Sequence, residues 1–171
     1  NTSGTVVLLE LAASLAEARK RSPEKFKRGV IFCWWTGEEL GLLGSAQYAK
    51  NPLIPFKQVV SYINLDMVGR MKNNQLIMQG MGSSSVWKKM VEKRNVAAGF
   101  SLKLSNDPYQ PTDITSIYPK GVPSIALFTG LHKDYHKPTD DPDTLNYEVL
   151  DPITKFTGRL TMDMVGDMER P

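Results

Sequence analysis

Apolar residues occur along this chain in two patterns, as short continuous runs and as longer stretches with helical spacing. A continuous run bounded by turn residues predicts a strand that is covered on both faces of a mostly parallel sheet. Such runs occupy residues 29–35, 59–66 and 122–129. Shorter segments predict a strand over residues 75–79 and an edge strand over residues 100–104.

Helical spacing predicts helices between these strands. The first helix ends near residue 21, and the others cover residues 40–50, 85–98 and the segment from residue 151, where Pro152 suits a first helical position. One further helical turn is expected within the loop of residues 105–121. Strands that alternate with helices are typical of a three-layer α/β/α sandwich with a mostly parallel mixed sheet. We expect residues 1–171 to form one such α/β domain.

The composition excludes several classes of protein. The net charge is only +3 and the Lys and Arg residues are scattered, so the sequence predicts no nucleic-acid partner. No apolar stretch approaches the ~20 residues that a membrane-spanning helix needs. The single cysteine, Cys33, excludes an internal disulfide and a Cys-based zinc site. Together with Trp34 and Trp35, it is expected to lie in the buried strand of residues 29–35.

Two adjacent carboxylates, Glu38 and Glu39, follow that predicted strand directly. In an open α/β sheet, functional sites form at the carboxyl ends of the strands. Neighbouring side chains diverge there, so one carboxylate can bind a metal ion while the other faces a bound water. A structural alternative is a capping box, in which Thr36 and Glu39 satisfy the free amides at a helix start.

Further ligand-type side chains follow the other two buried strands. Asp66 ends the run of residues 59–66, and both histidines of the chain, His132 and His136, lie in the polar loop of residues 130–146. Carboxylates and imidazoles without thiolates suit zinc, manganese or cobalt in a hydrolytic site. Taken singly, Asp66 also suits an Asx-turn and His136 an exposed turn.

Other catalytic patterns are missing from the sequence. It contains no Gly-x-Ser-x-Gly motif, so it does not indicate a serine hydrolase. The stretch of residues 80–85 is rich in Gly and Ser but lacks the Gly-Lys-Ser/Thr ending of a phosphate-binding loop. A flexible turn before a helix explains it.

Four motifs occur in an order that resembles a known family. They are Asn-Thr-Ser-Gly at residues 1–4, Thr-Gly-Glu-Glu-Leu-Gly-Leu-Leu-Gly-Ser at residues 36–45, Asn-Leu-Asp-Met-Val-Gly at residues 64–69, and Asp-Tyr-His-Lys-Pro-Thr-Asp at residues 134–140. The chain resembles the co-catalytic zinc exopeptidase family of bacterial leucyl aminopeptidases and glutamate carboxypeptidases. The resemblance covers essentially the whole chain, and it implies the zinc-exopeptidase fold.

The resemblance implies a role for each matching residue. Glu38 matches the general base that activates the attacking water. Glu39 and His136 match two ligands of one zinc, and Asp66 matches a ligand of the other. The residues that it places in the substrate pocket are Met67, Phe128, Tyr135 and Tyr109.

The family pattern also contains residues that would precede Asn1. These are an Asp that bridges the two zinc ions and a His that binds one of them. We therefore interpret the chain as an N-terminally truncated, partial catalytic domain that holds part of a site for two zinc ions. On this interpretation the fragment binds metal weakly, has little activity, and exposes surface that favours self-association.

The function that the resemblance implies is a zinc-dependent aminopeptidase that acts on peptides. A glutaminyl-cyclase-like transferase and a non-catalytic binding module on the same fold are the alternatives. Arg70, four residues after Asp66, also leaves open a carboxypeptidase or dipeptidase that binds a substrate carboxylate. By the same resemblance, we expect an extracellular or periplasmic location.

Overall fold

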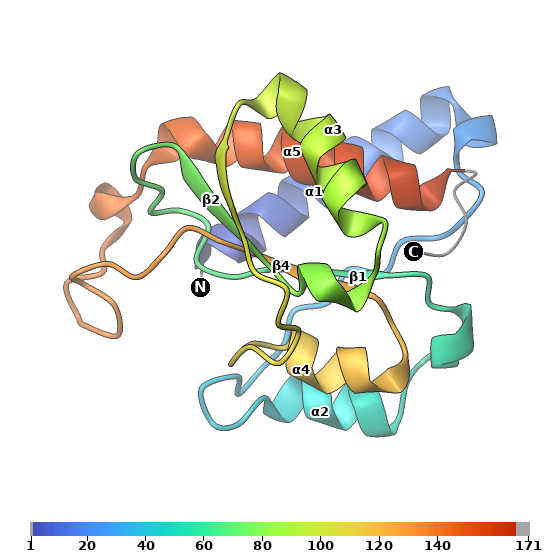
Figure 1. Cartoon of the computed structure of the whole chain (residues 1–171), viewed down its shortest axis with the longest axis horizontal. Helices are drawn as coiled ribbons and strands as arrows, with labels where there is room; N and C mark the ends of the chain where they lie inside the picture. Colours follow the sequence, from blue (N-terminus) through green and yellow to red (C-terminus); the bar gives the residue numbers. More distant parts are fainter. Residues whose placement is uncertain (1, 167–171) are drawn as a thin grey trace.

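The computed structural model describes residues 2–166, and Figure 1 shows a sheet with helices on both of its faces. Four strands form one sheet in the order β1-β4-β2-β3. Their bounds are Tyr62–Leu65 for β1, Gln75–Gln79 for β2, Ser101–Leu104 for β3 and Ser124–Phe128 for β4. The β1–β4 and β2–β3 pairs are parallel, and the β2–β4 pair is antiparallel. The mostly parallel mixed sheet predicted from the sequence is therefore confirmed.

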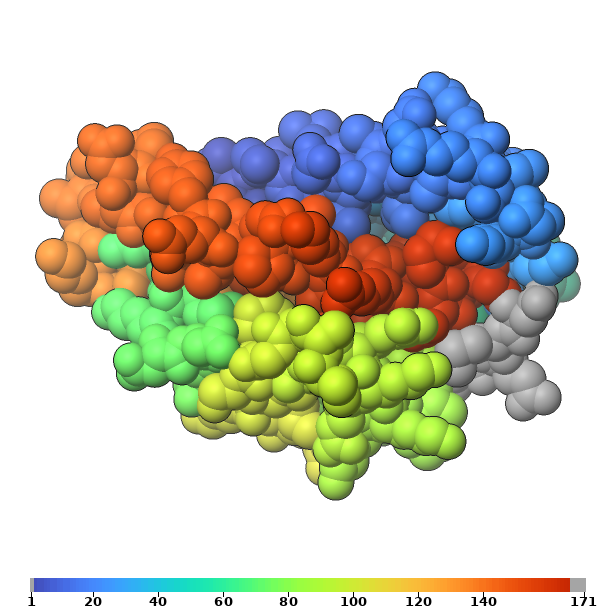
Figure 2. Space-filling model, turned by 90° about the horizontal axis from the view of Figure 1, so that it is seen from above, coloured from blue at the N-terminus to red at the C-terminus, as the bar shows by residue number. Residues whose placement is uncertain are grey.

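Helices form the two outer layers of the sandwich. One face of the sheet is covered by α1 (Thr2–Arg21), α3 (Trp87–Ala98) and α5 (Tyr147–Val165), as Figure 1 shows. Figure 2 views this face, with α5 in red lying between α1 in blue and α3 in yellow-green. The shorter helices α2 (Leu43–Lys50) and α4 (Ile114–Ile117) lie on the other face. The arrangement is the expected three-layer α/β/α sandwich.

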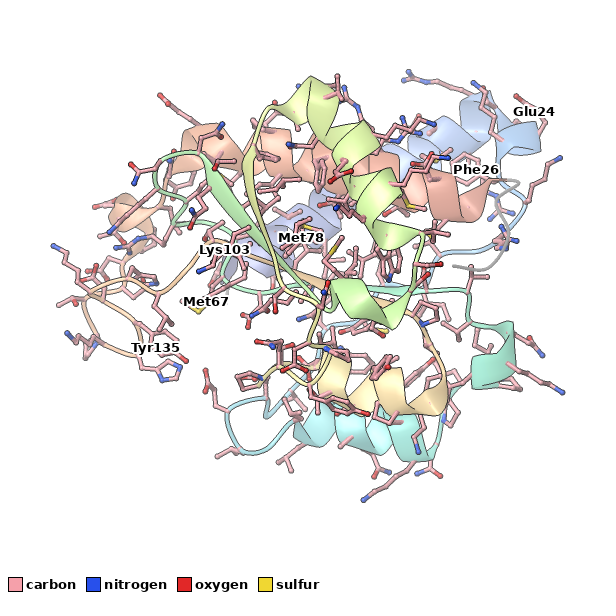
Figure 3. All side chains as sticks on the ribbon, viewed as in Figure 1. Glu24, Phe26, Met67, Met78, Lys103 and Tyr135 are labelled. Carbon is pink, nitrogen blue, oxygen red and sulfur yellow. The ribbon has the colours of Figure 1, made fainter. Side chains whose placement is uncertain are left out.

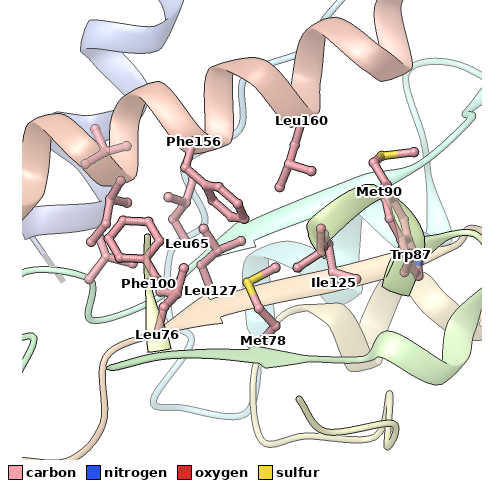
Figure 4. Close-up of a cluster of buried hydrophobic side chains, with 14 of the residues drawn as sticks. Leu65, Leu76, Met78, Trp87, Met90, Phe100, Ile125, Leu127, Phe156 and Leu160 are labelled. Carbon is pink, nitrogen blue, oxygen red and sulfur yellow. The ribbon is translucent and has the colours of Figure 1, made fainter. Parts of the chain in front are cut away.

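The main hydrophobic core lies between the sheet and the layer of α1, α3 and α5 (Figure 4). Phe156 of α5 is fully buried at its centre and packs edge-on against Phe100, with ring centroids 5.6 Å apart. A smaller cluster on the opposite face holds α2 and α4 to the sheet through Ala49, Ile117 and Val122. Both faces of the sheet are thus covered, which explains why the buried strand β4 is a continuous apolar run.

The predicted strand of residues 29–35 is not formed. Val30, Ile31 and Trp34 are 36%, 47% and 46% exposed, and Cys33 and Trp35 are only partly buried. A strand requires a hydrogen-bonding neighbour. Within residues 2–166, no other strand pairs with this segment, and it makes no backbone hydrogen bond. The prediction of a buried strand was therefore wrong, and Phe32 alone among these residues packs against the main core, from a partly buried position.

Two predicted helix starts also differ from the structure. Helix α2 begins at Leu43 without a side-chain cap, so the capping-box alternative for Thr36 and Glu39 is excluded. Helix α5 begins at Tyr147, four residues before the predicted start, and Pro152 lies inside it. The earlier start follows from an anchor just before the helix, since the Asn146 amide donates a hydrogen bond to the Gly69 carbonyl oxygen, 2.8 Å away.

None of the described helices is long and apolar enough to cross a bilayer.

Candidate active site

A cleft of about 1640 Å³ separates the segment of residues 29–35 from β1. Its lining includes all four residues that the sequence predicts for catalysis and metal binding, namely Glu38, Glu39, Asp66 and His136. These side chains come from three parts of the chain: the turn before α2, the end of β1, and the loop after β4. The carboxyl ends of the parallel strands β1 and β4 therefore meet at this cleft.

The turn that carries the two adjacent carboxylates is tightly closed. The Glu38 carbonyl oxygen accepts hydrogen bonds from the amides of Gly41 and Leu42, at 3.0 and 2.8 Å. The Gly44 amide donates to the Thr36 carbonyl oxygen at 2.9 Å, and a Cβ atom at Gly44 would lie only 2.8 Å from the Thr36 nitrogen. Glycine is required at this close approach, which holds the turn against the start of α2.

Glu39 and His136 are in direct contact across the cleft. The His136 Nε2 atom lies 2.6 Å from a Glu39 carboxylate oxygen. The ring of Tyr135 stacks on the His136 ring, with centroids 3.8 Å apart and an interplanar angle of 25°. His136 itself has a φ of +55°, an uncommon backbone conformation for a residue other than glycine. The predicted exposed turn for His136 is thus present, and its imidazole faces a carboxylate.

Glu38 lies in a negatively charged part of the cleft. Partial burial raises the pKa of the Glu38 carboxyl group, and the charges of Glu39, Asp66 and Asp113 raise it further. The positive charge of His136 acts in the opposite direction. A carboxyl group whose pKa is raised in this way holds a proton more readily, as a general acid–base catalyst requires.

Asp113 precedes α4 and adds a buried carboxyl group near Glu38. Burial raises its pKa, whereas a hydrogen bond with Ser45 lowers it. Within residues 2–166, its Oδ1 atom has no hydrogen-bond partner. Asp66 is anchored by its backbone, since its amide donates a hydrogen bond to the Leu127 carbonyl oxygen of β4, 3.0 Å away.

Two of the four residues expected in the substrate pocket are among those that line the cleft. Met67 and Tyr135 both line the cleft, and Figure 3 labels them on the side of the molecule where the loop after β4 projects. Phe128 ends β4, where it pairs with Ile77 of β2. Tyr109 is 61% exposed and packs edge-on against Tyr118. The pocket roles of all four residues stay predictions.

The predicted metal ligands converge only in part. Among the described residues, no group of three or more His, Cys, Asp or Glu side chains lies close enough together to hold a metal ion. Glu39 and His136 touch, whereas Asp66 lies in the same cleft without joining that pair. The ligand and base roles of these residues stay predictions.

The sequence alone did not reveal the partners of Arg70. Its guanidinium group donates hydrogen bonds to Asp134 at 2.6 Å and to Asp140 at 2.8 Å, both in the loop that carries His136. The bond from Arg70 is the main cause that lowers the pKa of the Asp134 carboxyl group. The only signal in the sequence was the presence of two acids beside the histidine.

Comparisons with known proteins identify the family of the chain. Residues 1–161 match the family model described as Peptidase family M28. The chain belongs to peptidase family M28. Its membership confirms the resemblance to zinc exopeptidases inferred from the sequence.

Relatives of this M28 chain are longer than the chain itself. Leucine aminopeptidase 2 of Trichophyton rubrum is 32% identical over 141 residues, which cover 76% of this chain and 27% of that protein. The LapA aminopeptidase of Legionella pneumophila has a TM-score of 0.82 at 20% identity, over 99% of this chain and 47% of LapA. BSAP, a zinc aminopeptidase from Bacillus subtilis, has a TM-score of 0.76 at 25% identity, over 99% of this chain and 42% of BSAP. The chain thus spans about a quarter of the curated relatives that it matches and less than half of these structures.

Proposed function

We propose that this M28 chain is part of a zinc-dependent exopeptidase that removes residues from the N-termini of peptides. The observation that carries the proposal is the contact between Glu39 and His136, with Glu38 beside it in the same cleft. The names of the aminopeptidase relatives support the same reaction.

The side chains of the cleft fit zinc in their chemistry. An imidazole nitrogen and a carboxylate oxygen meet there, and both are common zinc ligands. Glu39 and His136 would hold one ion, and Asp66 would bind a second. Bound zinc would supply a Lewis acid that polarises the substrate carbonyl and lowers the pKa of the attacking water.

Glu38 acts as the proton carrier in this proposal. Its carboxylate accepts a proton from the attacking water, and the protonated acid then donates that proton to the leaving amine. The raised pKa of Glu38 suits both steps, since the group must hold the proton between them. Glu39 cannot share this role while it is engaged with His136.

The charges of the cleft favour an aminopeptidase over a carboxypeptidase. Glu38 and Asp113 line the cleft and bind no metal in this proposal, so their charges can attract the ammonium group of a free N-terminus. A carboxypeptidase needs a free cation to bind the substrate carboxylate. Arg70 does not supply one, because its guanidinium group is paired with Asp134 and Asp140.

Zinc titration of the chain by calorimetry tests the proposed ligands. We expect one weak site that is lost in Glu39→Gln and in His136→Ala but retained in Glu38→Gln, because Glu38 carries protons and is not a ligand. Glu10→Gln, which changes an exposed carboxylate on α1, is the matched control. No zinc binding at all, two sub-micromolar sites, or loss of the site in Glu38→Gln would each contradict the assignment.

Product analysis tests the reaction itself. With zinc present, we expect slow release of the first residue from leucine-leading peptides, and we expect Glu38→Gln to abolish it. Formation of pyroglutamate from glutamine-leading peptides without such release would favour the glutaminyl-cyclase alternative. Turnover that persists in Glu38→Gln would exclude the proposed base.

The expected location and association state belong to the same proposal. An extracellular or periplasmic location is the prediction that follows from the family resemblance, and fractionation of the source cells tests it. Self-association through the exposed apolar side chains of residues 29–35 predicts a mass that rises with concentration in sedimentation experiments.

A further inference from the structure

The loop that carries His136 has little regular structure of its own. We define this His loop as residues 130–146; it contains a single short 3₁₀ turn, at Pro142–Thr144. Most of its side chains are exposed, so little apolar burial fixes its path. His136 also adopts a positive φ, which is unfavourable for a residue with a Cβ atom. The contact between His136 and Glu39 therefore needs support from other interactions.

Hydrogen bonds to the segment after β1 hold both ends of the His loop. Before its first residue, the Thr129 amide and hydroxyl both donate to the Met67 carbonyl oxygen, at 3.3 and 2.5 Å. At its last residue, the Asn146 amide donates to the Gly69 carbonyl oxygen at 2.8 Å, and its side chain donates to the Met71 carbonyl oxygen at 3.2 Å. These anchors fix the ends of the loop but not its middle.

Arg70 lies between those anchors, and its side chain binds the middle of the loop. One guanidinium nitrogen donates to Asp134 at 2.6 Å, and the other donates to Asp140 at 2.8 Å and to Thr144. Only 11% of the Arg70 side chain is exposed, so water competes weakly for these bonds. Thr139 extends the network, because its hydroxyl donates to the second oxygen of Asp134 at 3.0 Å.

We propose that Arg70 is a positioning residue that holds the His loop so that His136 faces Glu39. Asp134 and Asp140 lie on either side of His136 in the sequence, so the two bonds from Arg70 fix the chain before and after it. The planar fork of an arginine can bind both carboxylates at once, which the single ammonium group of a lysine cannot reproduce. The importance of this role for metal binding rests on the proposed function, whereas its effect on the loop does not.

Loss of Arg70 changes the population of the binding-competent loop. Without its bonds, the middle of the loop samples other conformations, and the affinity for zinc falls in proportion to the fraction in which His136 faces Glu39. Removal of partners that orient metal ligands typically weakens metal binding by about 10- to 100-fold. The core packing of α1, α3 and α5 does not involve this loop, so global stability should change little.

Arg70→Met and Arg70→Lys test the proposal, with Arg94→Met as the matched control. Arg94 forms a comparable partly buried ion pair with Asp163, between α3 and α5 and away from the cleft. The measurements are hydrogen exchange of residues 131–140 by mass spectrometry, zinc affinity by calorimetry, and unfolding in urea. In Arg70→Met, we expect exchange in the loop to rise about 10-fold or more and zinc affinity to fall by about 10-fold or more. Arg70→Lys should recover part of both losses, and Arg94→Met should change neither.

Several outcomes would overturn the inference. Unchanged exchange of the His loop in Arg70→Met would show that Arg70 does not hold it. Equal effects in Arg94→Met would show a general loss of stability instead of a local one. If the unsubstituted chain binds no zinc, the proposed function fails, and the exchange experiment alone still decides the role of Arg70.

Discussion

The Tyr62 hydroxyl group connects β1 to the segment that leads to Glu38. It accepts a hydrogen bond from the indole nitrogen of Trp35 at 2.9 Å and donates one to the Asn64 side-chain oxygen at 2.8 Å. Burial raises the pKa of this hydroxyl far above the ordinary tyrosine value, so it remains a protonated donor throughout the neutral range. The bridge joins the two walls of the cleft at one point.

Tyr62→Phe removes both hydrogen bonds while it keeps the aromatic ring. A typical hydrogen bond contributes about 1 kcal/mol net, and a buried acceptor left unpaired costs about 1–3 kcal/mol. Asn64 is only 9% exposed, whereas Trp35 is partly exposed and can donate to water instead. We therefore expect the free energy of unfolding to fall by about 2 kcal/mol. Hydrogen exchange should rise in residues 30–42, because the segment loses its tether to β1.

Urea denaturation and exchange by mass spectrometry measure the two effects. The matched control is Tyr147→Phe, whose hydroxyl donates to the Pro142 carbonyl oxygen at the surface, 3.2 Å away. That change should alter the unfolding free energy by no more than about 0.5 kcal/mol. Equal stability of Tyr62→Phe and the control, with unchanged exchange in residues 30–42, would refute the idea that this hydroxyl ties the segment to the sheet.

Three further predictions concern stability. Phe156→Ala should lower the unfolding free energy in urea by about 3–5 kcal/mol because it empties the centre of the core, whereas Val96→Ala, at an 87% exposed position, should change it by less than about 0.5 kcal/mol. Gly80→Ala should destabilise the protein more than Gly99→Ala in the same assay; both glycines have positive φ, but only at Gly80 would a Cβ overlap a carbonyl oxygen of β4. The pKa of Asp113 is raised in the folded state, so folding favours the protonated carboxyl group. The stability that this protonated group contributes is complete below about pH 4 and is lost as the pH rises through the folded-state pKa. The Asp113→Asn variant should thus be more stable than the unsubstituted chain at neutral pH. A difference in unfolding free energy between the two proteins that stays constant from pH 3 to pH 7 in chemical denaturation would contradict this.

Local patterns in the sequence predicted most of the fold. Residues 75–79 were predicted as a strand with the bounds that β2 has, because their pattern and the turn before them are both local. The run of residues 29–35 is as apolar as β4, yet it is no strand here, because strand formation depends on a neighbour that local sequence does not reveal. The start of α5 was misplaced for a similar reason, since the anchor at Asn146 is a contact with the distant Gly69.

The site was predictable to the extent that strand ends determine it. Glu39 and His136 were both placed after predicted strands, where sites form, and they touch, although residues 29–35 form no strand in the structure. The contacts of Arg70 with Asp134 and Asp140 join residues more than sixty positions apart, so no local pattern could show them. Of the four residues expected in the pocket, Met67 and Tyr135 line the cleft, and the pocket roles of Phe128 and Tyr109 stay predictions.

The position of the open cleft has a consequence for how the site responds to its surroundings. Glu38 and Glu39 lie in the turn that follows residues 29–35, and Asp66 follows β1. The width of the cleft between these two segments therefore sets the separation between the carboxylates. Any polypeptide or small molecule that enters the cleft and changes this width also alters how tightly the carboxylates hold a cation. Thermodynamic linkage makes the effect mutual: a bound cation changes the affinity for that occupant by the same factor.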